Sequence, residues 1–273
     1  MGKKPFKKRL KKMLTQKPRS AIVLLHTVTN KHNMRTKTLL LAAAISVAGL
    51  VSSQAATVYS QNVVGYINYT LPAHGFALVA NQLDLSPSND VNSVLANGMV
   101  SGETKLFLWN GTGYKAFTYY NAVDAAPSPG GWYDSSFNLS TNTLNIGEGA
   151  FLQNPGASPI TATFVGTVRQ GTNNTAIALG FNLYSLAYPV ATNIDSFPAT
   201  SGQDHYFHWN GTGYDRVLTY YNSVDAAPSP AGWYDSSFVL QSTNASYMPT
   251  VGESFFFQHF GSPTNWTTDF IVQ

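Results

Sequence analysis

From residue 57 to the end, the chain consists of short runs rich in Val, Ile, Phe, Tyr and Thr, separated mainly by Gly, Pro and Asn. Such runs are typical of β-strands, and the residues between them are typical of turns. Helical spacing of apolar positions occurs at residues 90–97, where Asp90 suits an N-cap. The pattern predicts an all-β protein, folded as a sandwich or a partly open barrel.

The faces of one predicted strand can be compared between two places in the chain. In residues 105–109, Phe107 and Trp109 fall on one face and two leucines on the other. The later counterpart keeps Phe207 and Trp209, but the opposite face becomes a tyrosine and a histidine. The face that stays large and apolar is expected to be the inner face of a half-buried strand.

Glycine-rich segments predict the connections. Asn110-Gly111-Thr112-Gly113 tolerates positive φ, which predicts a β-hairpin over residues 104–120. The later counterpart has one additional residue between Tyr214 and Thr219, which predicts a bulge or a longer turn. The pairs Gly147-Glu148 and Gly252-Glu253 are expected to be turns that enter buried strands.

The chain is an internal duplication of a unit of about 105 residues. Residues 109–114 recur at 209–214, 118–121 at 219–222 and 124–137 at 225–238. We therefore expect two tandem homologous β modules, 56–166 and 167–273, each with one short helix. Residues 165–168 resemble the opening of the first module, so they are expected to finish one module and open the next. This leaves no room for a flexible linker, and the modules should pack as a rigid pair.

The two copies differ unevenly. From residue 109 to 137, 24 of 29 residues have an identical partner, whereas from 75 to 85 only 3 of 11 do. Two interpretations remain open. The duplication is recent or locally converted, or both copies use this segment for the same contact.

The N-terminal region has the organisation of an export signal. After Met34 come two basic residues, fourteen largely apolar residues from 38 to 51, and small residues that suit cleavage after Ala55 or Ala56. The apolar run is shorter than the roughly 20 residues that span a bilayer, so no permanent membrane span is expected. Residues 34–55 are predicted to be a signal peptide. The basic residues 1–33 are predicted to be an unstructured leader, discarded with it.

Charge is divided between the two ends. Twelve of the 16 Lys and Arg residues lie at or before Lys37, and all 13 Asp and Glu residues lie from Asp84 onward, so the chain after residue 55 carries 4 − 13 = −9. An acidic body argues against nucleic acid as a partner. The sequence contains no cysteine, so stability must come from the core without disulfides. A chain with 44% hydrophobic residues can build such a core.

A resemblance can be stated on four elements and the segment that ends the first module. They are residues 63–67, 75–81, 109–114 and 147–151, followed by 163–166. Together they resemble a group of tandem-repeat, signal-peptide-bearing secreted proteins of unknown function common in Verrucomicrobia. The likeness extends over residues 57–273. It implies export to the periplasm, outer surface or exterior and a β module, and it assigns no site residues.

Enzyme motifs are largely missing from the sequence. There is no Gly-x-Ser-x-Gly, no His-Glu-x-x-His, no phosphate loop and no cysteine nucleophile. Asp204, His205 and His208 could suggest a metal site, but strand positions three apart point to opposite faces. We expect an ordinary polar surface there and no cofactor.

Repeated carboxylates flank the duplicated Pro-Ser-Pro loop, and three interpretations apply to them. Paired carboxylates could act as acid and base on a glycosidic bond, as in a glycoside hydrolase. Asp oxygens with loop carbonyls could instead hold calcium, which accepts irregular oxygen ligands. The plainest interpretation is that they cap turns by accepting bonds from backbone amides. The candidate calcium ligands are Asp124, Asp134, Asp225 and Asp235.

Aromatic residues next to these carboxylates admit a binding role. A flat ring can stack on a sugar while nearby polar groups bond its hydroxyls, and two such patches would add affinity. Burial is the ordinary alternative for Trp and Tyr. The candidate ligand-binding residues are Tyr119, Tyr120, Trp132, Tyr133, Asp134, Tyr220, Tyr221, Trp233, Tyr234 and Asp235.

The sequence thus favours a non-catalytic, exported or cell-envelope β-repeat protein with a structural, adhesive or assembly role. A glycan-binding protein that uses the duplicated loops is the alternative, and a hydrolase is the third interpretation. The expected partner is an extracellular polysaccharide or an envelope protein. Exposure of Trp132 and Trp233 would favour glycan binding, and their burial would favour the structural interpretation.

Overall fold

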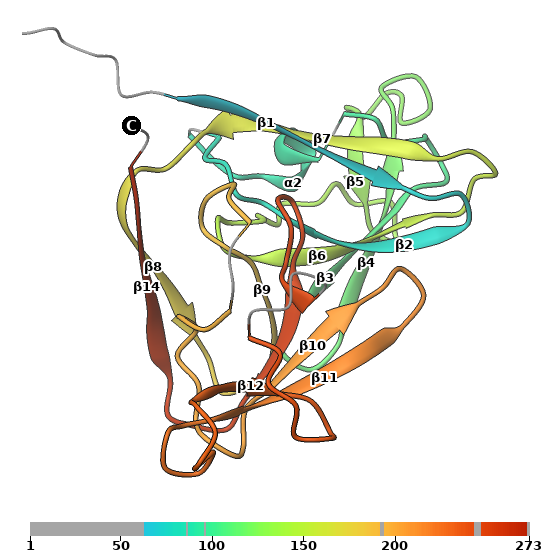
Figure 1. Cartoon of the computed structure of the whole chain (residues 1–273). Coiled ribbons are helices and arrows are strands. Elements are labelled where there is room, and N and C mark those ends of the chain that lie inside the picture. Colours follow the sequence, from blue (N-terminus) through green and yellow to red (C-terminus); the bar gives the residue numbers. More distant parts are fainter. Residues whose placement is uncertain (1–62, 86, 96, 192–193, 243–246, 272–273) are drawn as a thin grey trace, which may run out of the picture. The chain divides into compact units, whose positions relative to one another are not determined.

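The computed structural model describes residues 63–271 except 86, 96, 192–193 and 243–246 (Figure 1). The predicted leader, residues 1–33, and the predicted signal peptide, residues 34–55, lie outside the described residues. The described chain is built almost wholly of antiparallel strands, which confirms the all-β prediction. In this part of the chain, no helix is long and apolar enough to cross a membrane.

The first half forms two antiparallel sheets. Strand β1 (Val64–Leu71) pairs with β7 (Ile160–Thr167) along its whole length. A five-stranded sheet has the order β2 (Gly75–Ala80), β6 (Gly149–Asn154), β3 (Lys105–Trp109), β4 (Tyr114–Tyr120) and β5 (Gly131–Tyr133).

The second half repeats this order strand for strand. Strand β8 (Gly171–Ile177) pairs with β14 (Thr264–Phe270). The second five-stranded sheet has the order β9 (Gly180–Tyr184), β13 (Phe255–His259), β10 (His205–Trp209), β11 (Tyr214–Tyr221) and β12 (Gly232–Tyr234). Residues 165–167 belong to β7 of the first half, and only residues 168–170 connect β7 to β8. The strand that opens the second half is β8.

Local features agree with the sequence pattern. Strands β3 and β4 form the predicted hairpin, and Asn110 Oδ1 accepts bonds from the amides of Thr112 (3.0 Å) and Gly113 (2.8 Å) in its turn. In the second hairpin the register shifts next to Trp209, which confirms the predicted bulge. The one α-helix in the described residues is α2 (Val91–Val94), which is shorter than predicted. Its N-cap is Asp90, as expected.

Each half is a sandwich with its own core. In the first, Ile67 of β1 and Phe164 of β7 pack against Leu106 and Leu152 of the five-stranded sheet. In the second, Trp266 of β14 packs in the same cluster as residues of β10 and β13. A two-stranded sheet therefore covers one face of each five-stranded sheet.

The other faces of the two five-stranded sheets meet in a third cluster. Its buried centre is Leu78, Phe151, Leu183 and Phe256, and Phe107, Trp109, Phe207 and Trp209 pack against it. The prediction that Phe107 and Trp109 form the inner, core-facing side of a half-buried strand is therefore wrong. The leucines of β3 enter the module core, and the aromatic face contacts the sister module. Both faces of the strand are covered, and the aromatic pair recurs because both modules contribute it to one junction.

Matching hydrogen bonds cross this junction in both directions. Trp109 Nε1 donates to the Phe181 carbonyl at 2.6 Å, and Trp209 Nε1 donates to the Phe76 carbonyl at 3.4 Å. The Ala80 amide donates to Gly252 O at 2.9 Å, and the Ser185 amide donates to Gly147 O at 2.8 Å. Each pair consists of equivalent residues of the two copies. The interface is isologous, as in a twofold dimer, although one chain forms both sides.

We predict that Phe256→Ala lowers the free energy of unfolding by about 3–5 kcal/mol, because it leaves a cavity in the junction. Phe256 is 6% exposed, and its ring lies 5.5 Å from that of Trp109 and 6.3 Å from that of Phe151 (centroid distances). Val123→Ala is the control. Val123 is 83% exposed, so its change should stay within about 0.5 kcal/mol. Urea unfolding followed by tryptophan fluorescence measures both. Two separate transitions in the unmodified protein would contradict a shared junction.

Candidate functional site

The duplicated loop connects β4 to β5, and β11 to β12, and has the same internal bonding in both copies. Asn121 Oδ1 accepts bonds from the amides of Val123 (2.8 Å) and Asp124 (2.9 Å). Asn222 Oδ1 repeats both bonds at the same distances. The peptide bonds before Pro127 and Pro228 are cis in both copies. Local structure thus accounts for much of the identity between the copies.

Both tryptophans of the candidate binding residues are buried. Trp132 and Trp233 are each 0% exposed, and each indole N–H donates to a carbonyl at 3.1 Å, Leu95 O and Ile194 O respectively. No face of either ring is accessible for stacking on a sugar, and this burial favours the structural interpretation. Strands β5 and β12 lie at the sheet edges and direct the indoles inward, where the polar N–H still finds an acceptor.

The neighbouring tyrosines pack against other rings of the loop. Tyr133 is 2% exposed and stacks on Phe137, with ring centroids 4.5 Å apart. Tyr119 packs against Trp132 at 5.5 Å, and Tyr120 packs against Phe137 at 5.1 Å, both half-buried. The second copy repeats these contacts with Tyr220, Tyr221, Tyr234 and Phe238. The tyrosine rings therefore pack against neighbouring aromatic rings of their own module.

The carboxylates after these tyrosines cap turns. Asp134 Oδ1 accepts bonds from the amides of Ser136 and Asn138, both at 2.9 Å. Asp235 Oδ1 accepts from Ser237 at 2.9 Å and Val239 at 3.0 Å. The bond from the Asn138 amide is the main cause that lowers the pKa of Asp134 below its ordinary value, and the bond from the Val239 amide does the same for Asp235. This is the turn-capping arrangement, the plainest of the three interpretations.

The candidate calcium ligands do not converge in the described residues. Asp124 is exposed, and Asp225 accepts a hydrogen bond from the Ser201 hydroxyl. Across the described ranges, no group of three or more His, Cys, Asp or Glu side chains is arranged to hold a metal ion. Asp204, His205 and His208 likewise have separate partners, which are His259 (2.7 Å), Thr219 (3.0 Å) and Asp215 (2.8 Å).

The loops, and the turns that follow β5 and β12, expose apolar side chains that were not candidates from the sequence. Val123 is 83% exposed and Val224 79%, while Phe137 is 47% and Phe238 46% exposed. We call these four residues the apolar rim. They occupy equivalent positions in the nearly identical segments of the two copies, so their retention in both copies could have indicated them as candidates. A search for binding residues passes over valine and phenylalanine because they are normally buried.

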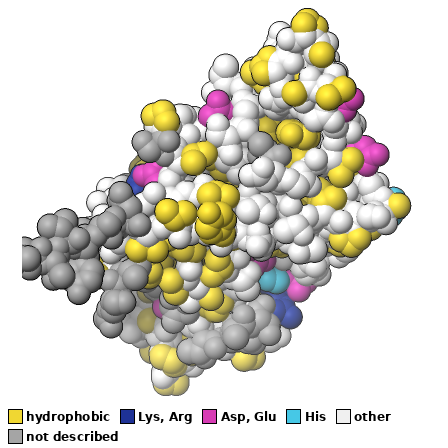
Figure 2. All heavy atoms as spheres, turned by 90° about the horizontal axis from the view of Figure 1, so that it is seen from above, with side chains coloured by type: hydrophobic (Ala, Val, Ile, Leu, Met, Phe, Trp, Pro, Cys, Tyr) yellow, Lys and Arg dark blue, Asp and Glu magenta, His cyan; other side chains and the backbone are white. Residues whose placement is uncertain are grey.

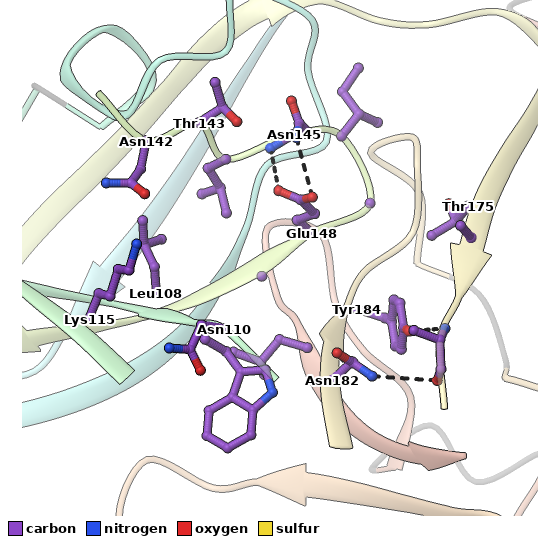
Figure 3. Close-up of a pocket in the computed structure, with 18 of the residues that line it drawn as sticks. Leu108, Asn110, Lys115, Asn142, Thr143, Asn145, Glu148, Thr175, Asn182 and Tyr184 are labelled. Atoms are coloured by element: carbon purple, nitrogen blue, oxygen red, sulfur yellow. Dashed lines mark hydrogen bonds between the residues drawn. The ribbon is translucent and has the colours of Figure 1, made fainter. Parts of the chain in front are cut away.

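A second feature is a hollow of about 660 Å³ between the two halves, which we call the junction cleft (Figure 3). One wall is the segment before β6 together with the β3–β4 hairpin, and the other is formed by β8 and β9. Amide and hydroxyl side chains predominate among its polar residues, which are Asn110, Lys115, Thr141, Asn142, Thr143, Asn145, Glu148, Asn174, Thr175 and Asn182. None of them was a candidate from the sequence.

The charged groups of the junction cleft are one lysine and one glutamate. Glu148 accepts bonds from the Asn145 amide at 2.8 Å and from Asn145 Nδ2 at 3.2 Å (Figure 3). Lys115 extends from β4 toward the segment that carries Asn142. Tyr184 closes one end, where its hydroxyl accepts a bond from the Ala178 amide at 2.8 Å, and burial raises its pKa. The cleft can offer many neutral donors and acceptors with no net charge.

No family model, curated protein or solved structure matches the chain.

We predict that Asp134→Ala lowers stability at neutral pH and has little effect at about pH 2. The pKa of Asp134 is depressed in the folded protein, so its contribution is present above the ordinary carboxyl pKa and is lost as pH falls through the folded value. Urea midpoints at the two pH values measure the effect. Asp124→Ala is the matched control, because no hydrogen bond to the Asp124 carboxylate is found in the described structure. An equal loss at both pH values would contradict the capping role.

Proposed function

We propose that the protein is a non-catalytic, exported component of the cell envelope or cell surface, with an adhesive or assembly role carried by a rigid pair of sister modules. The observation that carries this proposal is the apolar rim. Val123 and Val224 stand at equivalent places, 83% and 79% exposed, in a loop whose retained Asn121 and Asn222 side chains bond to the loop backbone. Together with the exposed rings of Phe137 and Phe238, these side chains are available for apolar contact with a partner.

The rim would act bivalently. The junction fixes the two modules relative to each other, so each loop is held at a set position, and a partner that contacts both loops would bind without the entropic cost of ordering a linker. Phe137 and Phe238 stack on buried tyrosines on one side and remain about half exposed on the other. They are therefore held in place for contact.

The chemistry of the rim favours an envelope protein as the partner. Valine and phenylalanine bury apolar area but provide no hydrogen bonds for the hydroxyls of a polysaccharide. The net charge of −9 after residue 55 disfavours nucleic acid. A role without turnover is supported by Asp134 and Asp235, whose carboxylates already accept bonds from their own turns. Export is supported by the basic, apolar and small-residue order of residues 34–56.

We predict that Val123→Asp together with Val224→Asp weakens the binding of residues 56–273 to isolated envelopes of the source cells by about a hundredfold or more. Each single change should have a smaller effect, since one loop still binds. Co-sedimentation of the purified, labelled protein with the envelopes, titrated to saturation, measures this.

The matched control is Thr112→Asp with Thr212→Asp, which adds the same charges at exposed turn positions of both hairpins. The proposal fails if the unmodified protein does not sediment with envelopes, or if the valine double variant binds as well as the control. Release of soluble sugars from envelope polysaccharide by the purified protein would contradict a role without turnover.

A further inference from the structure

The junction cleft has a counterpart position on the other side of the molecule, because the modules repeat each other. Leu71 pairs with Ile160 at the end of β1, and Ile177 pairs with Thr264 at the end of β8. Counting back two residues along each strand makes Tyr69 the equivalent of Thr175. Gly147, in the turn before β6, and Gly252, in the turn before β13, are likewise equivalent. Gly147 lies next to β8, and Gly252 lies next to β1.

The side chains at this equivalent position differ in size. A Cβ atom on Gly147 would lie 2.9 Å from Thr175 Oγ1, so this threonine lines the cleft next to the turn. A Cβ atom on Gly252 would lie 2.7 Å from Ile67 and 3.8 Å from the ring of Tyr69. The phenol of Tyr69 is largely buried, which raises its pKa to about 12. Next to Gly252, the ring of Tyr69 fills this space. Next to Gly147, the smaller Thr175 leaves the equivalent space open as part of the cleft.

Several polar atoms of the cleft have no protein partner in the described structure. Asn110 and Asn174 use their side-chain oxygens as acceptors, but their Nδ2 groups donate to no described atom. The amine of Lys115 forms no ion pair among the described residues, although the residue lines the cleft. Asn110 and Lys115 thus offer donors to a ligand at the cleft, where Figure 3 shows both residues. Trp109 adds an aromatic wall, held by its bond to the Phe181 carbonyl.

Charge decides which class of ligand suits this set of groups. Lys115 and Glu148 contribute one positive and one negative charge, and the carboxylate of Glu148 already accepts two bonds from Asn145. An ionised ligand would therefore find no net countercharge. On the face seen in Figure 2, uncharged polar and apolar atoms also predominate, and charged side chains form only separate spots. Neutral hydroxyl groups match amide donors and acceptors beside an aromatic ring.

We propose that the junction cleft binds a short stretch of a neutral polysaccharide. Its volume of about 660 Å³ lies within the range of roughly 300–1,000 Å³ for small-molecule sites. The sugar hydroxyls would bond to the asparagine and threonine side chains and to the Lys115 amine, next to the ring of Trp109. The site uses no residue of the apolar rim, so it stands independently of the proposed envelope-protein contact.

The test is Thr175→Tyr in residues 56–273, which places in the cleft the side chain that the chain itself uses at the equivalent position. The unmodified protein should bind neutral oligosaccharides on a glycan microarray that also carries uronic-acid and sulfated glycans. Calorimetry with the best neutral binder should show at least a tenfold loss of affinity for Thr175→Tyr. Thr175→Ser keeps the hydroxyl and the open space, so it should bind within about twofold of the unmodified protein.

Two further variants keep the result interpretable. Lys115→Ala changes an exposed side chain, should leave the urea midpoint unchanged, and should weaken binding at least threefold if Thr175→Tyr does not fold. The double variant Val123→Asp and Val224→Asp should bind the oligosaccharide normally, which separates this site from the rim. The proposal is overturned if no neutral glycan binds, if acidic glycans bind better, or if folded Thr175→Tyr and Lys115→Ala both bind as the unmodified protein does.

Discussion

The packing of two aromatic sheet faces against each other is the interaction on which the rest of this structure depends. Phe107 and Trp109 of one module meet Phe207 and Trp209 of the other around Phe256, and equivalent hydrogen bonds cross in both directions. In this fused pair each equivalent position contributes to the interface twice, once from each copy. A change in one copy therefore has to fit the unchanged copy, which explains why the aromatic pair is retained while the residues behind it differ.

Much of the fold follows from local chemistry. The hairpin turn, the bulge near Trp209 and the cap at Asp90 each depend on a few neighbouring residues, and the sequence predicted all three. The inner and outer faces of β3 were assigned wrongly, because alternation shows that two faces differ but not what covers each. A second module over the aromatic face can be recognised only when both sheets are placed in space.

In the candidate site, too, features set by neighbouring residues could be predicted, whereas features set by residues far apart in the sequence could not. Capping by Asp134 and Asp235 was one of the predicted interpretations, since an acceptor two to four residues before free amides is a local property. Burial of Trp132 depends on β5 joining the sheet edge over a carbonyl 37 residues away, which sequence spacing does not indicate. The junction cleft combines residues 141–149 with residues 174–184, and the contact between these segments exists only in the assembled pair.

The connection of three residues between β7 and β8 has a consequence for how the paired state depends on concentration. Two separate chains joined by such an interface would come apart on dilution, since a dimer's stability depends on protomer concentration. Here residues 168–170 keep the partner surfaces at a fixed local concentration, however dilute the surroundings become. Fusion of the copies thus makes the paired state independent of the protein concentration.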